Sequence, residues 1–218
     1  MTTMVYLREQ LDGVRVLPVL QVESEEQAVG LCRALQAGGL KGVEITLRTS
    51  AALAAISAVK KTLPDLMVAA GTVNSIRDME SVAAAGVDLA VSPGLTRLLS
   101  DCARELGMPF LPGVSTASEI LGGLELGYTT FKFFPAETSG GVAALSAFGA
   151  PFQGVSFCPT GGINQENLAD YLKLPNVICA GGSWMVPKDL LADRDWQAIE
   201  SRARQLLEFL GQLPARES

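Results

Sequence analysis

Short apolar runs alternate with longer amphipathic stretches along almost the whole chain. The apolar runs are rich in Val, Ile, Phe and Ala, and a glycine commonly closes the stretch before a run, as at Gly39, Gly86, Gly107 and Gly127. A glycine in that place supplies the turn that ends a helix. Successive units are roughly 20–25 residues long, about the length of one helix and one strand.

This alternation predicts eight strands with helices between them. The strands are expected at 15–22, 42–47, 66–71, 87–92, 109–114, 129–134, 154–159 and 176–181. The helices are expected at 24–37, 50–62, 75–85, 95–106, 116–126, 140–148, 164–173 and 195–210. Eight strand–helix units in succession predict an α/β fold, a single (β/α)₈ TIM barrel, and an open doubly wound sheet is the alternative.

No linker or change of composition divides the chain, so we expect one domain. It comprises a short extra N-terminal helix at 1–14, the barrel at 15–210 and a tail at 211–218. The first residues lack the basic and apolar regions of a signal peptide. Glycines and prolines interrupt the longest uncharged stretch, at 139–165, so it does not predict a membrane-spanning helix. We therefore expect a soluble, cytoplasmic protein.

The absence of histidine narrows the chemistry more than any other feature of the composition. Among the 218 residues there is no His, which excludes imidazole acid–base catalysis, imidazole-dependent triads and His-based zinc and iron sites. The four cysteines form no CxxC pair, so they predict buried thiols rather than a metal site. The net charge is −6 and no long basic run is present, so neither nucleic acid nor an anionic membrane is an expected partner.

Polar residues concentrate where the predicted strands end, and in a barrel the active site lies at that end. Lys132 lies in the run TTFKFFP, in which Thr130, Lys132 and Phe134 share one face of a strand. Burial disfavours the ammonium form of a lysine, and a neutral amine is the nucleophile that forms a Schiff base with a ketone. A lysine at a strand edge that reaches solvent is the alternative.

Glu44 falls on the inward face of the second predicted strand, in VEITL, and so shares the barrel interior with Lys132. A carboxylate beside an imine-forming lysine can relay protons. A structural ion pair with Lys132 or Arg48 is the other interpretation, and the two are compatible.

Arg48 and Thr72 follow at the ends of the second and third predicted strands. A guanidinium group binds a carboxylate through two hydrogen bonds, and a hydroxyl adds a further donor. The two residues therefore suit an anionic substrate, with a position on a surface loop as the alternative for Arg48.

Two glycine turns mark the ends of the seventh and eighth predicted strands, TGGIN at 160–164 and GGSW at 181–184. Paired glycines expose backbone N–H groups, and these two loops commonly bind phosphate in barrels. They predict a small phosphorylated substrate, the alternative being tight turns that bind nothing.

Seven segments carry a resemblance to a known family. They are VEITLRT at 43–49, AAGTV at 69–73, SPGLT at 92–96, PGVST at 112–116, FKFFPAE at 131–137, FCPTGGI at 157–163 and GGSWMVP at 181–187. In this order and without large gaps, they resemble the 2-keto-3-deoxy-6-phosphogluconate (KDPG) aldolases, the class I aldolases of the Entner–Doudoroff pathway. The combination of FKFFPAE, CPTGGI and GGSW is highly specific, and only the variable N-terminus departs from the family.

The resemblance implies a carbon–carbon lyase that cleaves KDPG to pyruvate and D-glyceraldehyde 3-phosphate. Some members also cleave 4-hydroxy-2-oxoglutarate (KHG), and members are homotrimers that need neither metal nor cofactor. Lys132 would form the Schiff base and Glu44 would act as general acid and base. The substrate-binding residues implied are Arg48 and Thr72, Thr160 near the pyruvyl carboxylate, Gly161, Gly162, Gly182 and Ser183 around the phosphate, and Phe134.

Three alternatives remain open at the level of sequence. A metal-free isomerase of sugar phosphates on the same barrel would not need a nucleophilic lysine, and metal-dependent epimerases are excluded because they need His ligands. A second alternative is an aldolase that acts mainly on the galactonate-derived C4 epimer or on KHG. The third is a barrel that senses a sugar phosphate without catalysis. The intact Lys, Glu and Arg set argues against it, because a binding protein gains nothing from a buried nucleophile.

Overall fold

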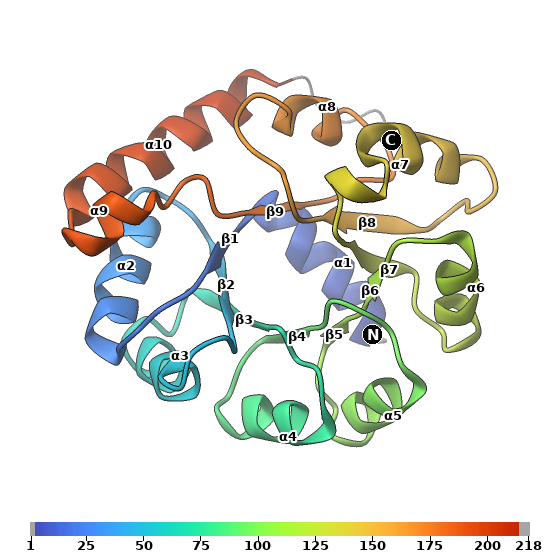
Figure 1. The fold of residues 1–218 in the computed structure, drawn as a ribbon, viewed down its shortest axis with the longest axis horizontal. Coiled ribbons are helices and arrows are strands. Elements are labelled where there is room, and N and C mark those ends of the chain that lie inside the picture. The colour runs from blue at the N-terminus through green and yellow to red at the C-terminus, as the bar shows by residue number, and fades with distance from the viewer. Residues whose placement is uncertain (1–2, 214–218) are drawn as a thin grey trace.

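The computed structural model describes residues 3–213, with parallel strands at the centre and helices around them (Figure 1). A six-stranded sheet has the order β5-β4-β3-β2-β1-β9, and a three-stranded sheet has the order β6-β7-β8. The strands are β1 (Val16–Leu20), β2 (Gly42–Thr46), β3 (Met67–Gly71), β4 (Leu89–Val91), β5 (Phe110–Leu111), β6 (Gly113–Val114), β7 (Thr130–Phe133), β8 (Ser156–Pro159) and β9 (Ala180–Gly182).

The prediction of a closed eight-stranded barrel is wrong, because the strands form an open half-barrel of six and a separate sheet of three. The fifth predicted strand is divided at Pro112 into β5 and β6, which belong to different sheets. Proline has no N–H group to donate, so the ladder of hydrogen bonds is interrupted there. In the described part of the chain, β8 meets the segment that contains β9 through two isolated bridges, Phe157 with Val177 and Thr160 with Gly181.

Most helices lie close to their predicted positions, and two short ones, Glu137–Ser139 and Lys188–Ala192, are not among those predicted. They are α1 (Thr3–Val14), α2 (Glu25–Ala37), α3 (Ala52–Thr62), α4 (Ile76–Ala84), α5 (Arg97–Glu105), α6 (Ala117–Glu125), α7 (Gly141–Gly149), α8 (Leu168–Leu172) and α10 (Trp196–Gln212), with the short helices η1 (Glu137–Ser139) and α9 (Lys188–Ala192). Helix α8 begins later than predicted because Asn164 Oδ1 accepts the amides of Glu166 and Asn167 and holds a turn. The predicted tail begins inside α10, and its part from 214 lies outside the described residues.

Alternate strand residues divide the buried core into two parts. One set, which includes Phe157, packs outward against the helices. The other set, which includes Leu17, faces the interior and packs with Leu11 of α1. Helix α1 covers the end at which the strands begin, since Val14 lies against Gly42 at the start of β2. The ends at which the strands stop therefore lie on the opposite side of the molecule from α1.

The first turn of α6 is fixed by a capping box, with Thr116 as the N-cap. Thr116 Oγ1 accepts the amide of Glu119 at 3.3 Å, and Glu119 Oε2 accepts the amides of Ser115 and Thr116 at 2.7 and 2.9 Å. Burial alone raises the pKa of Glu119. The hydrogen bonds that its carboxylate accepts from Ser115 and Thr116 outweigh burial and lower the pKa below its usual range.

We predict that Glu119→Gln destabilises the protein by about 0.5 kcal/mol at pH 7, because a carboxylate stabilises the N-terminus of a helix. The lowered pKa means that this contribution is present above the unfolded pKa, about 4.3, and is lost as the pH falls through the folded pKa. Urea unfolding of both proteins at intervals between pH 7 and 3 measures the difference. A difference that does not shrink toward low pH would contradict the role of the charge.

Candidate active site

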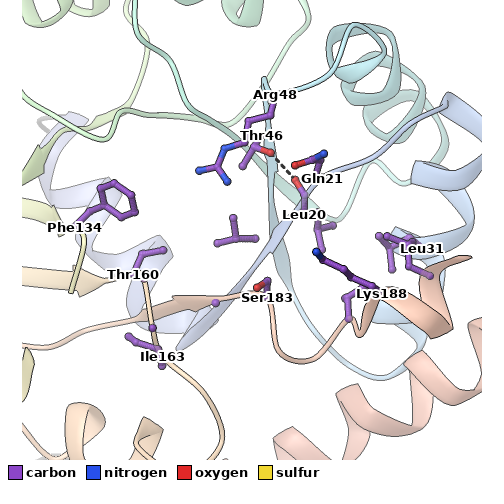
Figure 2. Close-up of a pocket in the computed structure, with 16 residues that line it drawn as sticks. Leu20, Gln21, Leu31, Thr46, Arg48, Phe134, Thr160, Ile163, Ser183 and Lys188 are labelled. Atoms are coloured by element: carbon purple, nitrogen blue, oxygen red, sulfur yellow. Dashed lines mark hydrogen bonds between the residues drawn. The ribbon is translucent and has the colours of Figure 1, made fainter. Parts of the chain in front are cut away.

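A cavity of about 380 Å³ opens where β1, β2, β8 and β9 end (Figure 2). Its polar lining consists of Gln21, Thr46, Arg48, Thr160, Ser183 and Lys188. One side of it is completed by Gly161 and Gly162 of the first predicted turn, Gly182 of the second, and the ring of Phe134. The cavity therefore lies at the end of the strands where the sequence places a site.

Lys132 on β7 and Glu44 on β2 meet in the interior between the two sheets. Lys132 Nζ lies 3.0 Å from Glu44 Oε1 and 3.3 Å from Oε2, and the side chains are 7% and 3% exposed. A buried charge requires a partner, and each of these charges is the partner of the other. The contact also places a proton acceptor within hydrogen-bond distance of a buried amine, a group that acts as a nucleophile once it is neutral.

The end of β3 shapes the surroundings of Glu44. A side chain on Gly71 would overlap the carboxylate of Glu44, so only glycine leaves room for it. The next residue, Thr72, has a φ of 66°, a left-handed conformation that is uncommon for residues other than glycine. Its Oγ1 accepts a hydrogen bond of 3.2 Å from Arg48 Nε. Strained backbone conformations of this kind are common at functional sites. Here the strained residue is the one whose hydroxyl contacts the guanidinium group of Arg48.

Phe134 connects the buried ion pair to the cavity. Its ring lines the cavity, and the ring centroid lies 5.5 Å from Lys132 Nζ. The face of an aromatic ring attracts a cation at this distance. Thr46, two residues after Glu44 on β2, lines the cavity as well, with its Oγ1 donating to the carbonyl of Leu20 at 3.0 Å. A ligand in the cavity therefore lies next to the lysine, although neither charged group of the pair is part of the lining.

The glycine turn after β8 presents polar atoms that lack partners. Thr160 is 6% exposed, and its Oγ1 forms no hydrogen bond with any described residue. Gly161 and Gly162 have φ values of 102° and 82°, which glycine adopts without strain. The N–H groups of Gly162 and Ile163 also donate to no residue in the range 3–213. A buried hydroxyl without a partner, such as that of Thr160, is unfavourable unless a ligand or water meets it, so this turn has the character of a binding loop.

The segment after the lysine strand supports this turn from behind. The amide of Glu137 donates to the carbonyl of Gly161 at 3.1 Å, and the Glu137 side chain fills the space that a Cβ on Gly162 would take. The Glu137 carboxylate accepts a hydrogen bond from the hydroxyl of Tyr171. Burial, together with the Glu137 carboxylate, raises the pKa of Tyr171, so the hydroxyl keeps the proton that it donates. The turn is thus attached to the chain that directly follows Lys132.

The second glycine turn, after β9, packs closely on its neighbours. A Cβ on Gly181 would approach Thr160 Oγ1, and one on Gly182 would overlap the ring of Trp184. Trp184 therefore packs under the turn, while Ser183 lines the cavity with its hydroxyl toward the open space (Figure 2). The two turns together form one wall of the cavity.

The structure brings together most of the residues that the sequence singles out. The cavity is lined by Arg48, Phe134, Thr160, Gly161, Gly162, Gly182 and Ser183, with Thr72 joined to it through Arg48 and the pair Lys132 and Glu44 joined through Phe134. Three polar residues of the lining, Gln21, Thr46 and Lys188, are not among the predicted site residues. A signal for each exists in the sequence. Gln21 directly follows an apolar strand, Thr46 lies two residues after Glu44 in VEITL, and Lys188 directly follows GGSWMVP.

The described residues restrict the chemistry further. Within residues 3–213 there is no group of three or more His, Cys, Asp or Glu side chains that could hold a metal ion. All four cysteines are buried, and burial raises the pKa of Cys32 to about 12. A thiol with so high a pKa is a poor nucleophile. The buried reactive groups next to the cavity are the amine of Lys132 and the carboxylate of Glu44, and the exposed amine of Lys188 lines the cavity itself.

Comparison with known proteins connects this geometry to a family. The sequence model of the KDPG and KHG aldolases matches residues 7–202. The KHG/KDPG aldolase of Escherichia coli (strain K12) is 48% identical over 193 residues, which cover 88% of this chain and 91% of the relative.

Solved structures agree with the sequence relatives. A KDPG aldolase from Legionella pneumophila, with pyruvate captured at low pH as a covalent carbinolamine intermediate, has a TM-score of 0.89 and 41% identity, over 91% of this chain and 97% of that one. The KDPG aldolase of Zymomonas mobilis ZM4 with 3-phosphoglycerate has a TM-score of 0.88 and 40% identity, over 93% and 95% of the two chains. On the strength of a family match over most of its length, this chain belongs to the KDPG and KHG aldolase family.

Proposed function

We propose that this protein is a single-domain class I aldolase, a carbon–carbon lyase. It cleaves KDPG reversibly to pyruvate and D-glyceraldehyde 3-phosphate, and it also cleaves KHG to pyruvate and glyoxylate. The observation that carries the proposal is the buried Lys132–Glu44 pair, 3.0 Å apart, beside a cavity with unpartnered donors in a glycine turn. The E. coli relative bears the names of both substrates, and the Legionella relative holds pyruvate as a covalent carbinolamine.

The reaction begins when the ammonium proton of Lys132 passes to Glu44 across their hydrogen bond. The neutral amine attacks the C2 ketone carbon of the substrate and forms a carbinolamine. Glu44 then shuttles protons from the nitrogen to the oxygen, so that water leaves and a protonated imine remains. No metal or other cofactor takes part, because the imine itself becomes the electron sink.

Cleavage follows from the charge on the imine. A base takes the proton of the C4 hydroxyl, the C3–C4 bond breaks, and its electron pair moves into the protonated imine to form an enamine. Glyceraldehyde 3-phosphate leaves as the aldehyde product. The enamine is protonated at C3, and water then hydrolyses the imine, which releases pyruvate and restores the amine of Lys132.

The cavity supplies the binding groups for the two ends of the substrate. Thr160 Oγ1, buried and unpartnered, meets the pyruvyl carboxylate, and Arg48 with Thr72 contacts the substrate at the end of β2 and β3. Phe134 packs on the substrate next to Lys132. The N–H groups of the two glycine turns, formed by Gly161, Gly162 and Gly182, and the hydroxyl of Ser183 hold the phosphate. The Zymomonas relative was solved with a phosphorylated acid, 3-phosphoglycerate, which supports a phosphate site in the family.

We extend the proposal to the assembly and its location. The protein is a cytoplasmic homotrimer whose partner is a small phosphorylated 2-keto acid, and it binds neither nucleic acid nor membrane. Leu98 and Leu121 are 69% and 55% exposed, and such apolar side chains are available for contact between subunits. No helix within residues 3–213 is long and apolar enough to cross a bilayer.

Borohydride reduction in the presence of pyruvate tests the imine. We expect one pyruvyl adduct, on Lys132, read by intact mass and then by peptide mapping. Lys132→Arg keeps a cation beside Glu44 but cannot form an imine, so it should fold and lose both the adduct and the turnover, as should Lys132→Ala. Lys61→Arg, on the exposed surface of α3, is the matched control and should retain both. Substantial cleavage of KDPG by Lys132→Arg would contradict the assignment of Lys132 as the Schiff-base lysine.

The role of Glu44 is tested separately. Glu44→Gln keeps the shape of the side chain and its contact with Lys132 but cannot relay protons. We expect kcat for KDPG to fall by at least ~10²-fold, the usual scale for a positioned proton-transfer group. A melting temperature near that of the wild type would show that the variant is folded. Near-normal kcat in a folded variant would leave Glu44 with a structural role only.

The trimer is tested by the mass of the purified protein. Light scattering coupled to size-exclusion chromatography should give three times the chain mass of 22.9 kDa. The mass should persist on dilution to the concentrations used for activity assays. A mass equal to one chain under those conditions would contradict the homotrimer.

A further inference from the structure

We propose that Lys188 supplies the positive charge of the phosphate-binding part of this cavity, a role that rests on the proposed function. Lys188 is the first residue of α9 and lines the cavity. Figure 2 shows its ammonium group directed into the open space, on the same side as Ser183. The ligand that it binds is a phosphate monoester dianion at the end of a short keto acid.

The charges around the cavity indicate an anion at each end. Arg48 and Lys188 are the charged residues among those described as lining the cavity, and no acidic residue accompanies them. A cavity lining without acidic residues contrasts with the chain as a whole, which carries a net charge of −6. Within residues 3–213, no carboxylate lies within ion-pair distance of Lys188. Its charge is therefore available to a ligand.

The two cations lie at different places along the substrate. Arg48 is hydrogen-bonded to Thr72 at the end of β3, on the side of the cavity toward Phe134 (Figure 2). The reacting ketone must lie at Lys132, which is 5.5 Å from the Phe134 ring centroid. A substrate that starts there extends along the glycine turns toward Ser183 and Lys188. Lys188 is thus placed for the distal phosphate, and Arg48 for groups near the ketone.

A short turn sets the position of Lys188. The amide of Val186 donates to the carbonyl of Ser183 at 3.1 Å, which reverses the chain directly after the second glycine turn. Pro187 then fixes the backbone just before α9. Lys188 is in this way attached to the loop that carries the phosphate-binding hydroxyl, five residues after it. The lysine and the loop form one unit.

A cation adds what the rest of the phosphate site lacks. Backbone N–H groups and a hydroxyl provide hydrogen bonds, but they do not neutralise two negative charges that leave water. A lysine ammonium group binds phosphate as a point charge and donates strong hydrogen bonds. Because Lys188 is exposed and its stem is long, solvent screens part of the attraction. We expect the charge to account for about tenfold in affinity, the lower end of the range for charged hydrogen bonds.

Substrates with and without phosphate separate this role from others. Lys188→Gln should raise KM for KDPG about tenfold, with kcat nearly unchanged and KM for KHG nearly unchanged. Lys188→Arg should restore most of the affinity for KDPG. Lys61→Gln, an exposed lysine on α3 far along the chain from the cavity, should match the wild type for both substrates. A KM for KDPG that Lys188→Gln leaves unaltered would overturn the proposal, and so would an equal rise for both substrates.

Two further measurements keep this proposal distinct from the proposed function. Ser183→Ala should raise KM for KDPG selectively, which locates the phosphate independently of Lys188. Titration calorimetry with inorganic phosphate should show weaker binding to Lys188→Gln than to the wild type, and this readout does not depend on catalysis. A wild-type protein that binds phosphate through Lys188 without cleaving KDPG would refute the aldolase alone. A wild-type aldolase whose phosphate affinity is the same in Lys188→Gln would refute the role of Lys188 alone.

Discussion

Two opposite charges, 3.0 Å apart and almost closed off from solvent, are the constraint on which the rest of the site depends. Removing an ammonium group and a carboxylate from water costs several kcal/mol for each ion, and the loss is offset only where the geometry around them is favourable. The neighbours meet this condition. Gly71 leaves room for the carboxylate of Glu44, and the Phe134 ring faces the amine of Lys132. The buried pair therefore restricts which residues can stand at the positions of Gly71 and Phe134.

Much of the fold follows from the sequence because local patterns specify local structure. The glycines that end helices and the apolar runs of the strands locate nearly every strand and helix within a few residues. Period-two alternation along the strands places Lys132 and Glu44 on facing sides. The same local patterns could not show that the barrel is left open. Pairing between strands depends on hydrogen bonds between distant residues, and at Pro112 one donor is missing, so the sheet divides inside a run that looks continuous.

The candidate site shows the same division between local and distant information. Residues in recognisable motifs, such as Thr160 and Ser183, lie in the cavity as the sequence leads one to expect. Lys188 lies in no such motif, and it reaches the cavity because the turn between Ser183 and Val186 reverses the chain. Glu137 stands within FKFFPAE, yet its contacts with Gly161 and with Tyr171 join it to residues that are distant in sequence. Contacts of this kind form only when distant parts of the chain fold together.

The attachment of the glycine turn to Glu137 has a consequence for substrate length. The turn that would hold a phosphate is bonded to residues a few positions after the lysine that would hold the ketone carbon, through Glu137 and Gly161. A displacement of the lysine strand would carry the turn with it, so the span between the two binding points stays constant. Under the proposed function, this constant span would favour phosphorylated keto acids with a fixed number of carbons between ketone and phosphate. A phosphorylated keto acid one carbon shorter or longer would then reach only one of the two binding points.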